Sequence, residues 1–182
     1  MLSICVDGPY GNSIDIQQYS HILLVAGGIG ITPLHSMLRT AVLLLQQSQE
    51  GRLGRLQCIR LVWSAKEIGM FDIFRDTFTR IISYFSMSRN SNDLIEPIVE
   101  TPFVHVSFEL FCSTARDLES VTDKEMLLPI TKERINVRKE VAALAGLNYS
   151  MVFACGPESL IKECEVACMN HKVAFHAEVF LL

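Results

Sequence analysis

Three glycines and a threonine–proline pair follow the first long apolar run of the chain. Residues 22–26 are all apolar, and residues 27–33 read Gly-Gly-Ile-Gly-Ile-Thr-Pro. Glycines lack a Cβ and let a ligand approach the backbone, while Thr32 suits an N-cap and Pro33 a first helical position. A helix start presents N–H groups and a partial positive charge. The segment therefore predicts a strand, a phosphate-binding turn and a helix, although a turn without any ligand has the same pattern.

A second turn of this kind follows a later apolar run. Residues 151–154 lead into Cys155-Gly156-Pro157, and Pro157 is expected at the first helical position. Parallel strands end at a common sheet edge, where ligands bind near a switch in strand order. We therefore expect the two turns to lie close together. Taken by itself, Cys155 is better explained as a buried structural thiol than as a site residue.

Alternating strand and helix patterns must position these turns. Further strands are predicted over residues 56–63, 104–111 and 173–180, and helices after Pro33, over 71–85, near 138–145 and after Pro157. This alternation predicts the α/β class, with an open parallel sheet and helices on both faces. Two polar, irregular stretches, near 85–102 and 113–133, are expected to be insertions, and the second is interpreted as a flap.

Composition narrows the function classes. The 182 residues fit one domain with an insertion, and 49% apolar residues suit strands buried on both faces. A net charge of −4 gives no basic field for nucleic acid. Six cysteines without CxxC pairs and five histidines without ligand spacing indicate neither a disulfide framework nor a metal site. No apolar run approaches the ~20 residues of a membrane span, so the chain is expected to be soluble.

Five motifs occur in a recognisable order, at residues 7–11 (Asp-Gly-Pro-Tyr-Gly), 25–33, 62–66 (Val-Trp-Ser-Ala-Lys), 153–157 (Phe-Ala-Cys-Gly-Pro) and 178–180 (Glu-Val-Phe). Together they resemble the NAD(P)-binding half of the ferredoxin–NADP reductase superfamily, and within it most of all the membrane ferric reductases and NADPH oxidases. The resemblance covers nearly the whole chain outside the two expected insertions. Each motif alone is weak, whereas the ordered set is specific.

This resemblance implies domain boundaries within the chain and a reaction for the full-length protein. Residues 1–12 would be the tail of a preceding FAD-binding barrel, and residues 13–182 the NAD(P)-binding domain. The reaction would be hydride transfer from NADPH to FAD, followed by electron transfer to ferric ion or dioxygen. The partners would be that barrel and a haem-bearing membrane domain, which places the full-length protein at the cytosolic face of a membrane. The isolated chain should turn over little.

The resemblance also assigns residues around the nicotinamide and the flavin. Cys155 would lie beside the nicotinamide, Glu178 near the flavin, and Phe180 over the flavin ring, although Leu181 and Leu182 follow it. A solvated Glu178 and a Phe180 that packs the sheet edge are the plain alternatives. The remaining nicotinamide and pyrophosphate contacts would come from Gly27, Gly28, Ile29, Gly30, Ile31, Thr32, Pro33, Gly156 and Pro157.

Two basic residues bear on cofactor preference. Lys66 matches a basic position that contacts the 2′-phosphate in NADPH-using relatives, and Arg134 is a second candidate. Two cations offset a dianionic phosphate, and arginine does so with two parallel hydrogen bonds. Glu67 works against this, and a solvated surface lysine is the plain alternative for Lys66. NADPH is therefore expected, with NADH as the alternative.

Two other functions stay open at this stage. The glycine turn also suits an NADH-dependent enzyme that resembles cytochrome b5 reductase, or a non-catalytic nucleotide-sensing or docking domain that uses the flap. An ordinary Rossmann dehydrogenase fits less well, because Pro33 stands at the third glycine position of its fingerprint. That fingerprint also needs an acid about 20 residues further on, and none is evident.

Overall fold

The apolar run near the start of the chain forms the centre of the sheet. The computed structural model describes residues 14–47, 54–87, 104–112 and 130–178. Within β1 (His21–Gly27), residues 22–26 are each at most 2% exposed, as expected of a strand buried on both faces. The expected barrel tail (1–12), Phe180 and most of both expected insertions lie outside the described residues.

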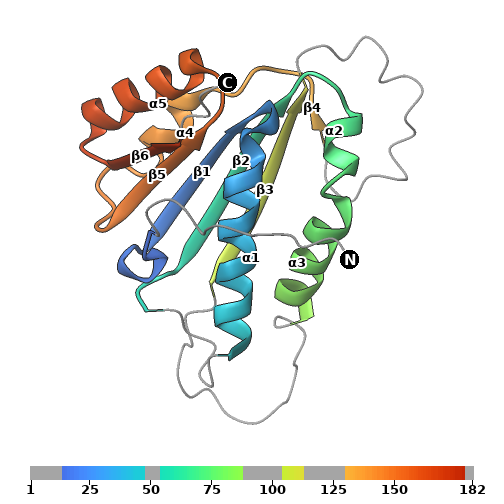
Figure 1. Ribbon diagram of the computed structural model, residues 1–182. Helices are drawn as coiled ribbons and strands as arrows, with labels where there is room; N and C mark the ends of the chain where they lie inside the picture. Colours follow the sequence, from blue (N-terminus) through green and yellow to red (C-terminus); the bar gives the residue numbers. More distant parts are fainter. Residues whose placement is uncertain (1–13, 48–53, 88–103, 113–129, 179–182) are drawn as a thin grey trace, which may run out of the picture.

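Six strands make one sheet, in which every pairing is parallel (Figure 1). They are β1, β2 (Cys58–Ala65), β3 (His105–Cys112), β4 (Ile130–Thr131), β5 (Ser150–Cys155) and β6 (Ala174–Glu178). Their order is β4-β3-β2-β1-β5-β6. The chain runs from β1 outward to β4 and then returns to the other side of β1. The switch point therefore lies between the ends of β1 and β5.

Helices cover both faces of this sheet, which confirms the expected fold class. They are η1 (Ile16–Gln18), η2 (Gly28–Gly30), α1 (Ile31–Gln47), α2 (Gly69–Asp72), α3 (Arg75–Met87), α4 (Val137–Ala142) and α5 (Glu158–His171). Alternate β1 side chains enter two cores: Leu24 packs with α1, α2 and α3, and Val25 packs with α4 and α5. Figure 1 shows α1 and α3 together, away from α4 and α5.

Two expected helix starts are wrong by one or two residues. The 3₁₀ turn η2 follows β1 directly and α1 begins at Ile31, so Thr32 and Pro33 are the second and third helical residues. Instead of capping, the Thr32 hydroxyl donates to the Ile29 carbonyl oxygen (3.0 Å). Pro157 is itself the N-cap of α5, with φ −57° and ψ 146°. The first helix starts earlier than expected because η2 runs directly into α1 and leaves no separate cap position at Thr32, whereas α5 starts one residue later than expected.

Other boundaries also differ from expectation. The segment 71–85 is divided into α2 and α3, with Ile73 and Phe74 between them. The second strand ends at Ala65 rather than Trp63. Ile130 and Thr131, inside the expected second insertion, form β4 against Leu110 and Phe111. A strand of two residues is too short to leave a periodic pattern in the sequence.

One helical stretch, Gly28–Gln47, has the length and mean hydropathy (1.3) of a membrane-crossing segment. The stretch is not an uninterrupted apolar run, because polar residues such as His35 and Arg39 interrupt it without lowering its average hydropathy much. Leu34, Leu38, Ala41 and Leu45 of this stretch are buried in the core beside the sheet. Core helices of globular domains pass the same length and composition test.

A charged cluster joins α4 to the sheet. The Arg60 guanidinium on β2 donates to Glu140 on α4 (Nε to Oε2, 2.6 Å) and to Glu109 on β3. The hydrogen bond to Glu140 is the main reason that the pKa of Arg60 is raised. The cluster fixes the helix that follows Arg134.

Candidate functional site

The two glycine-containing turns meet at the ends of β1 and β5. A Cβ on Gly27 would lie 2.6 Å from Pro157 Cδ, and one on Gly156 would lie 2.9 Å from Gly27 Cα. A Cβ on Gly30 would lie 2.8 Å from the Gly156 nitrogen. Real Cβ atoms are not found this close to other atoms, so only glycine permits the approach. The prediction that these sequence-distant turns converge is confirmed.

Gly28 differs from its neighbours because its free side faces open space. Its φ is +54°, and no atom lies within 4 Å of the place where a Cβ would be. Its carbonyl oxygen accepts a hydrogen bond from the Trp63 indole nitrogen (2.9 Å). The turn therefore exposes backbone on one side and is held from behind by β2.

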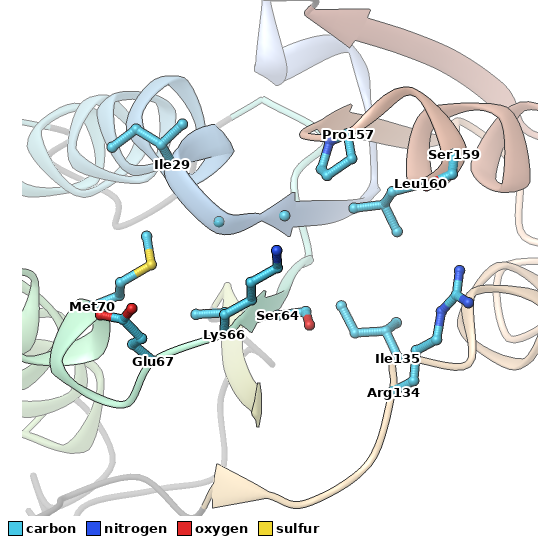
Figure 2. A pocket seen from close by; sticks show the side chains of 13 residues that line it. Ile29, Ser64, Lys66, Glu67, Met70, Arg134, Ile135, Pro157, Ser159 and Leu160 are labelled. Atoms are coloured by element: carbon cyan, nitrogen blue, oxygen red, sulfur yellow. The ribbon is translucent and has the colours of Figure 1, made fainter. Parts of the chain in front are cut away.

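A pocket of about 560 Å³ opens at this edge, within the usual range for small-molecule sites. Figure 2 shows Met70 and Glu67 on one side of Lys66, and Arg134 and Ile135 on the other. Its lining comprises Gly27, Gly28, Ile29, Ser64, Ala65, Lys66, Glu67, Met70, Arg134, Ile135, Pro157, Ser159 and Leu160.

Opposite charges meet on two sides of this pocket. Lys66 and Arg134 bring cations from the end of β2 and the entry to α4, while Glu67 brings a carboxylate beside Lys66. Arg134 Nη2 donates to Glu163 Oε2 on α5 (3.1 Å), and the Arg134 side chain is 72% exposed. Such an exposed pair is weak, so a phosphate can compete for the guanidinium. The Lys66 backbone carbonyl accepts from the Cys112 thiol (3.4 Å).

Cys155 lies under this edge rather than in the pocket lining. It is the last residue of β5, pairs with Ala26 and Glu178, and is fully buried. Desolvation, with a smaller contribution from the Glu178 carboxylate, raises the pKa of the Cys155 thiol to about 11. The thiol is therefore neutral at physiological pH. Glu178 is half-buried at the end of β6.

The structure brings some predicted residues together and leaves others beside the pocket. Gly27, Gly28, Ile29, Lys66, Arg134 and Pro157 line it. The lining does not include Gly30, Ile31, Thr32, Pro33, Cys155, Gly156 or Glu178. Sequence reasoning missed Ser64, Ala65, Met70, Ile135, Ser159 and Leu160 as lining residues. The position of Ser64 and Ala65 directly before Lys66 was an available signal, whereas the unpredicted strand β4 left none for Ile135.

The residues present fit a dinucleotide. The Gly28 backbone borders empty space that a side chain would fill, as the close approach of a pyrophosphate requires. The positive charges of Lys66 and Arg134 suit a further phosphate group. The apolar side chains of Ile29, Met70 and Leu160 offer surface against which a flat ring can pack. Within the described part of the chain, no three His, Cys, Asp or Glu side chains are grouped to hold a metal ion.

Comparisons with known proteins agree with this fit. The model of the "Ferric reductase NAD binding domain" family matches residues 19–169. Rat NADPH oxidase 1 is 25% identical over 94% of this chain, and Arabidopsis ferric reduction oxidase 4 is 41% identical over 36% of it. The solved CS-b5R domains of human Ncb5or (NAD+ form) cover 94% of this chain with a TM-score of 0.56 and 17% identity, which indicates the same fold.

The chain spans only part of these proteins. It corresponds to 31% of the rat oxidase, 9% of the Arabidopsis reductase and 39% of the solved Ncb5or chain. Each relative thus contains much more chain than the segment that matches here.

Proposed function

Because this chain belongs to the ferric reductase NAD-binding domain family, we propose that it binds NADPH at the switch-point pocket and presents it to FAD on another domain. The observation that carries the proposal is the contact between the Gly27 and Gly156 turns beside two pocket cations. Among α/β folds, this edge is where nucleotides bind.

The glycine turn would hold the pyrophosphate. Gly28 borders the pocket without any side chain, and the first turn of a helical segment has N–H groups that lack partners within the helix. Lys66 and Arg134 would hold the 2′-phosphate, which NADH lacks. Arginine suits this role because its planar group forms paired hydrogen bonds to phosphate.

Cys155 would lie beside the nicotinamide. When bound, NADPH supplies a hydride. The chain's own contribution is a small, polarizable and neutral thiol, buried directly beneath the edge where the two turns meet. Glu178, paired with Cys155 across β5 and β6, and Phe180 remain predicted flavin-side residues. In a longer protein, an FAD-binding barrel and a haem-bearing membrane domain would be the partners, and ferric ion or dioxygen the acceptor.

An NADH-dependent enzyme is the second candidate, favoured by two carboxylates. Glu67 lines the pocket beside Lys66, and Glu163 pairs with Arg134. A carboxylate at such a place binds the ribose hydroxyls of NADH and repels a 2′-phosphate. The two candidates therefore differ in the net charge that the pocket offers to the adenosine end.

Calorimetric titration with NADPH and NADH separates the candidates. We expect NADPH to bind about tenfold more tightly, and Lys66→Ala with Arg134→Ala to remove that preference. Lys162→Ala is the matched control, because Lys162 is exposed on α5 and pairs with Glu158 (2.7 Å) outside the lining. Preference for NADH would favour the second candidate, and binding of neither nucleotide would contradict both.

The hydride step is tested in a protein that also carries the flavin domain. Cys155→Ala should slow flavin reduction by bound NADPH at least severalfold, with nucleotide affinity little changed. An unchanged reduction rate would show that Cys155 is only a buried core residue. A nucleotide-sensing domain would bind NADPH and reduce no flavin, and a docking domain would bind neither nucleotide.

A further inference from the structure

The chain's single tryptophan is built into the back of the pocket. Trp63 lies in β2 and is fully buried. Its ring packs edge-on against Phe71 (4.7 Å between centroids, 85°) and Phe74 (5.6 Å, 84°), and Phe78 lies at 6.1 Å. These contacts leave the indole little freedom, and offset or edge-on aromatic pairs are favourable.

The indole nitrogen is directed at the glycine turn. It donates to the Gly28 carbonyl oxygen at 2.9 Å, and the same oxygen accepts the Ile31 amide. Both acceptor positions of that carbonyl are therefore used. A Cβ built on Gly28 would meet no atom within 4 Å beyond its chain neighbours, and its φ of +54° is a conformation that glycine adopts freely. The turn thus depends on what holds it from behind.

We propose that Trp63 is a positioning residue of the nucleotide site, whose indole N–H holds the Gly28 turn in its ligand-accepting shape. Trp63 also precedes Lys66 by three residues, and Ser64, Ala65 and Lys66 all line the pocket. The indole therefore ties the glycine turn to the strand that carries the cation. Backbone pairing of β1 with β2 sets the strand spacing as far as Gly27 and Ser64, and the indole hydrogen bond extends this tie beyond the strand to Gly28.

Removing only the N–H group tests this role. Because the chain has one tryptophan, growth on β-(3-benzothienyl)alanine replaces Trp63 alone and exchanges its N–H for sulfur. We expect amide hydrogen exchange over residues 28–31 to speed up about tenfold, because a packed turn loses a buried hydrogen bond. The second expected effect, on nucleotide binding, rests on the proposed function: the dissociation constant of the benzothienyl protein for NADPH should rise about tenfold. Trp63→Phe, a second variant without the N–H, should change both in the same direction.

Phe78→Leu is the matched control. It loosens packing around the same indole but removes no hydrogen bond to the turn. It should lower the melting temperature without altering exchange over residues 28–31 or NADPH affinity. Unchanged exchange in the benzothienyl protein, or equal changes in Phe78→Leu, would overturn the proposal. If the unaltered chain binds no NADPH, the proposed function fails, and the exchange measurement still decides the role of Trp63.

Discussion

Gly30 lies directly against the backbone of Cys155, so closely that a Cβ at position 30 would overlap the Cys155 carbonyl oxygen. This contact joins the turn after β1 to the turn after β5. The obstructing atoms belong to the backbone of a central strand and have no room to move aside. The two turns at the pocket edge can therefore pack against each other only because Gly30 has no side chain.

Gly30→Ala is expected to destabilise the chain by about 1–3 kcal/mol, the usual cost of overpacking a rigid site. The measurement is urea unfolding at neutral pH. Gly69→Ala is the control, because nothing lies within 4 Å of a Cβ built on Gly69 and its φ is not positive. The control should be neutral or slightly stabilising. Equal stability of the two variants would show that the turns separate easily.

Buried thiols should make the chain lose stability in alkali. Desolvation is the main cause that raises the pKa of Cys155 to about 11, of Cys164 to about 12 and of Cys168 to about 11, from an ordinary 9.0. Between pH 9 and 11 the unfolded chain releases these protons while the folded chain keeps them, so stability falls as pH rises. Below about pH 9 their contribution is complete.

Comparing urea unfolding at pH 8 and pH 10.5 measures this effect. Cys164→Ala removes one of the thiols and should show a smaller loss than the unaltered chain. Val166→Ala, at an exposed position of the same helix, is the control and should show the full loss. An identical loss in both variants would mean that other groups govern the alkaline limb.

Glu163→Gln should strengthen NADPH binding. The carboxylate neutralises the Arg134 guanidinium in the free chain, and a 2′-phosphate has to displace it. For a pair this exposed the gain is small, about two- to fivefold in the dissociation constant, with NADH unaffected. Titration of both nucleotides checks the outcome, and Glu165→Gln, exposed on the same helix, is the control. Weaker NADPH binding would instead mean that Glu163 positions Arg134 for its ligand.

Arg60→Ala should destabilise the chain by about 1–3 kcal/mol, less than for a fully buried pair because Arg60 is 35% exposed. It leaves Glu140, 11% exposed, without its main partner. Thermal unfolding gives the measurement. Lys162→Ala, which breaks a fully exposed pair with Glu158, should change the melting temperature little. If both changes are equally mild, water replaces the guanidinium at Glu140.

Much of the fold could be predicted because strands buried on both faces leave continuous apolar runs. Residues 22–26 and 151–154 show this directly. For the site, the two glycine turns and their convergence could be predicted, because Gly27 and Gly156 permit close contacts that no other residue permits. The place of Trp63 was not predictable: an indole in an apolar strand has no pattern that names its acceptor, since Gly28 belongs to a different strand end.

Because β1 lies between β2 and β5, the complete pocket can form only after β5 has been synthesised. β1 pairs on one side with β2, which follows it closely, and on the other with β5, which begins only at Ser150. A nascent chain on the ribosome can lay β1, β2 and β3 side by side long before the second neighbour of β1 has been synthesised. Contacts between such distant segments form slowly. Nucleotide recognition is therefore a late event in the life of each molecule. A chain cut short before residue 150 would hold strands β1 to β4 but would lack the second turn and the wall of the pocket that Pro157, Ser159 and Leu160 supply.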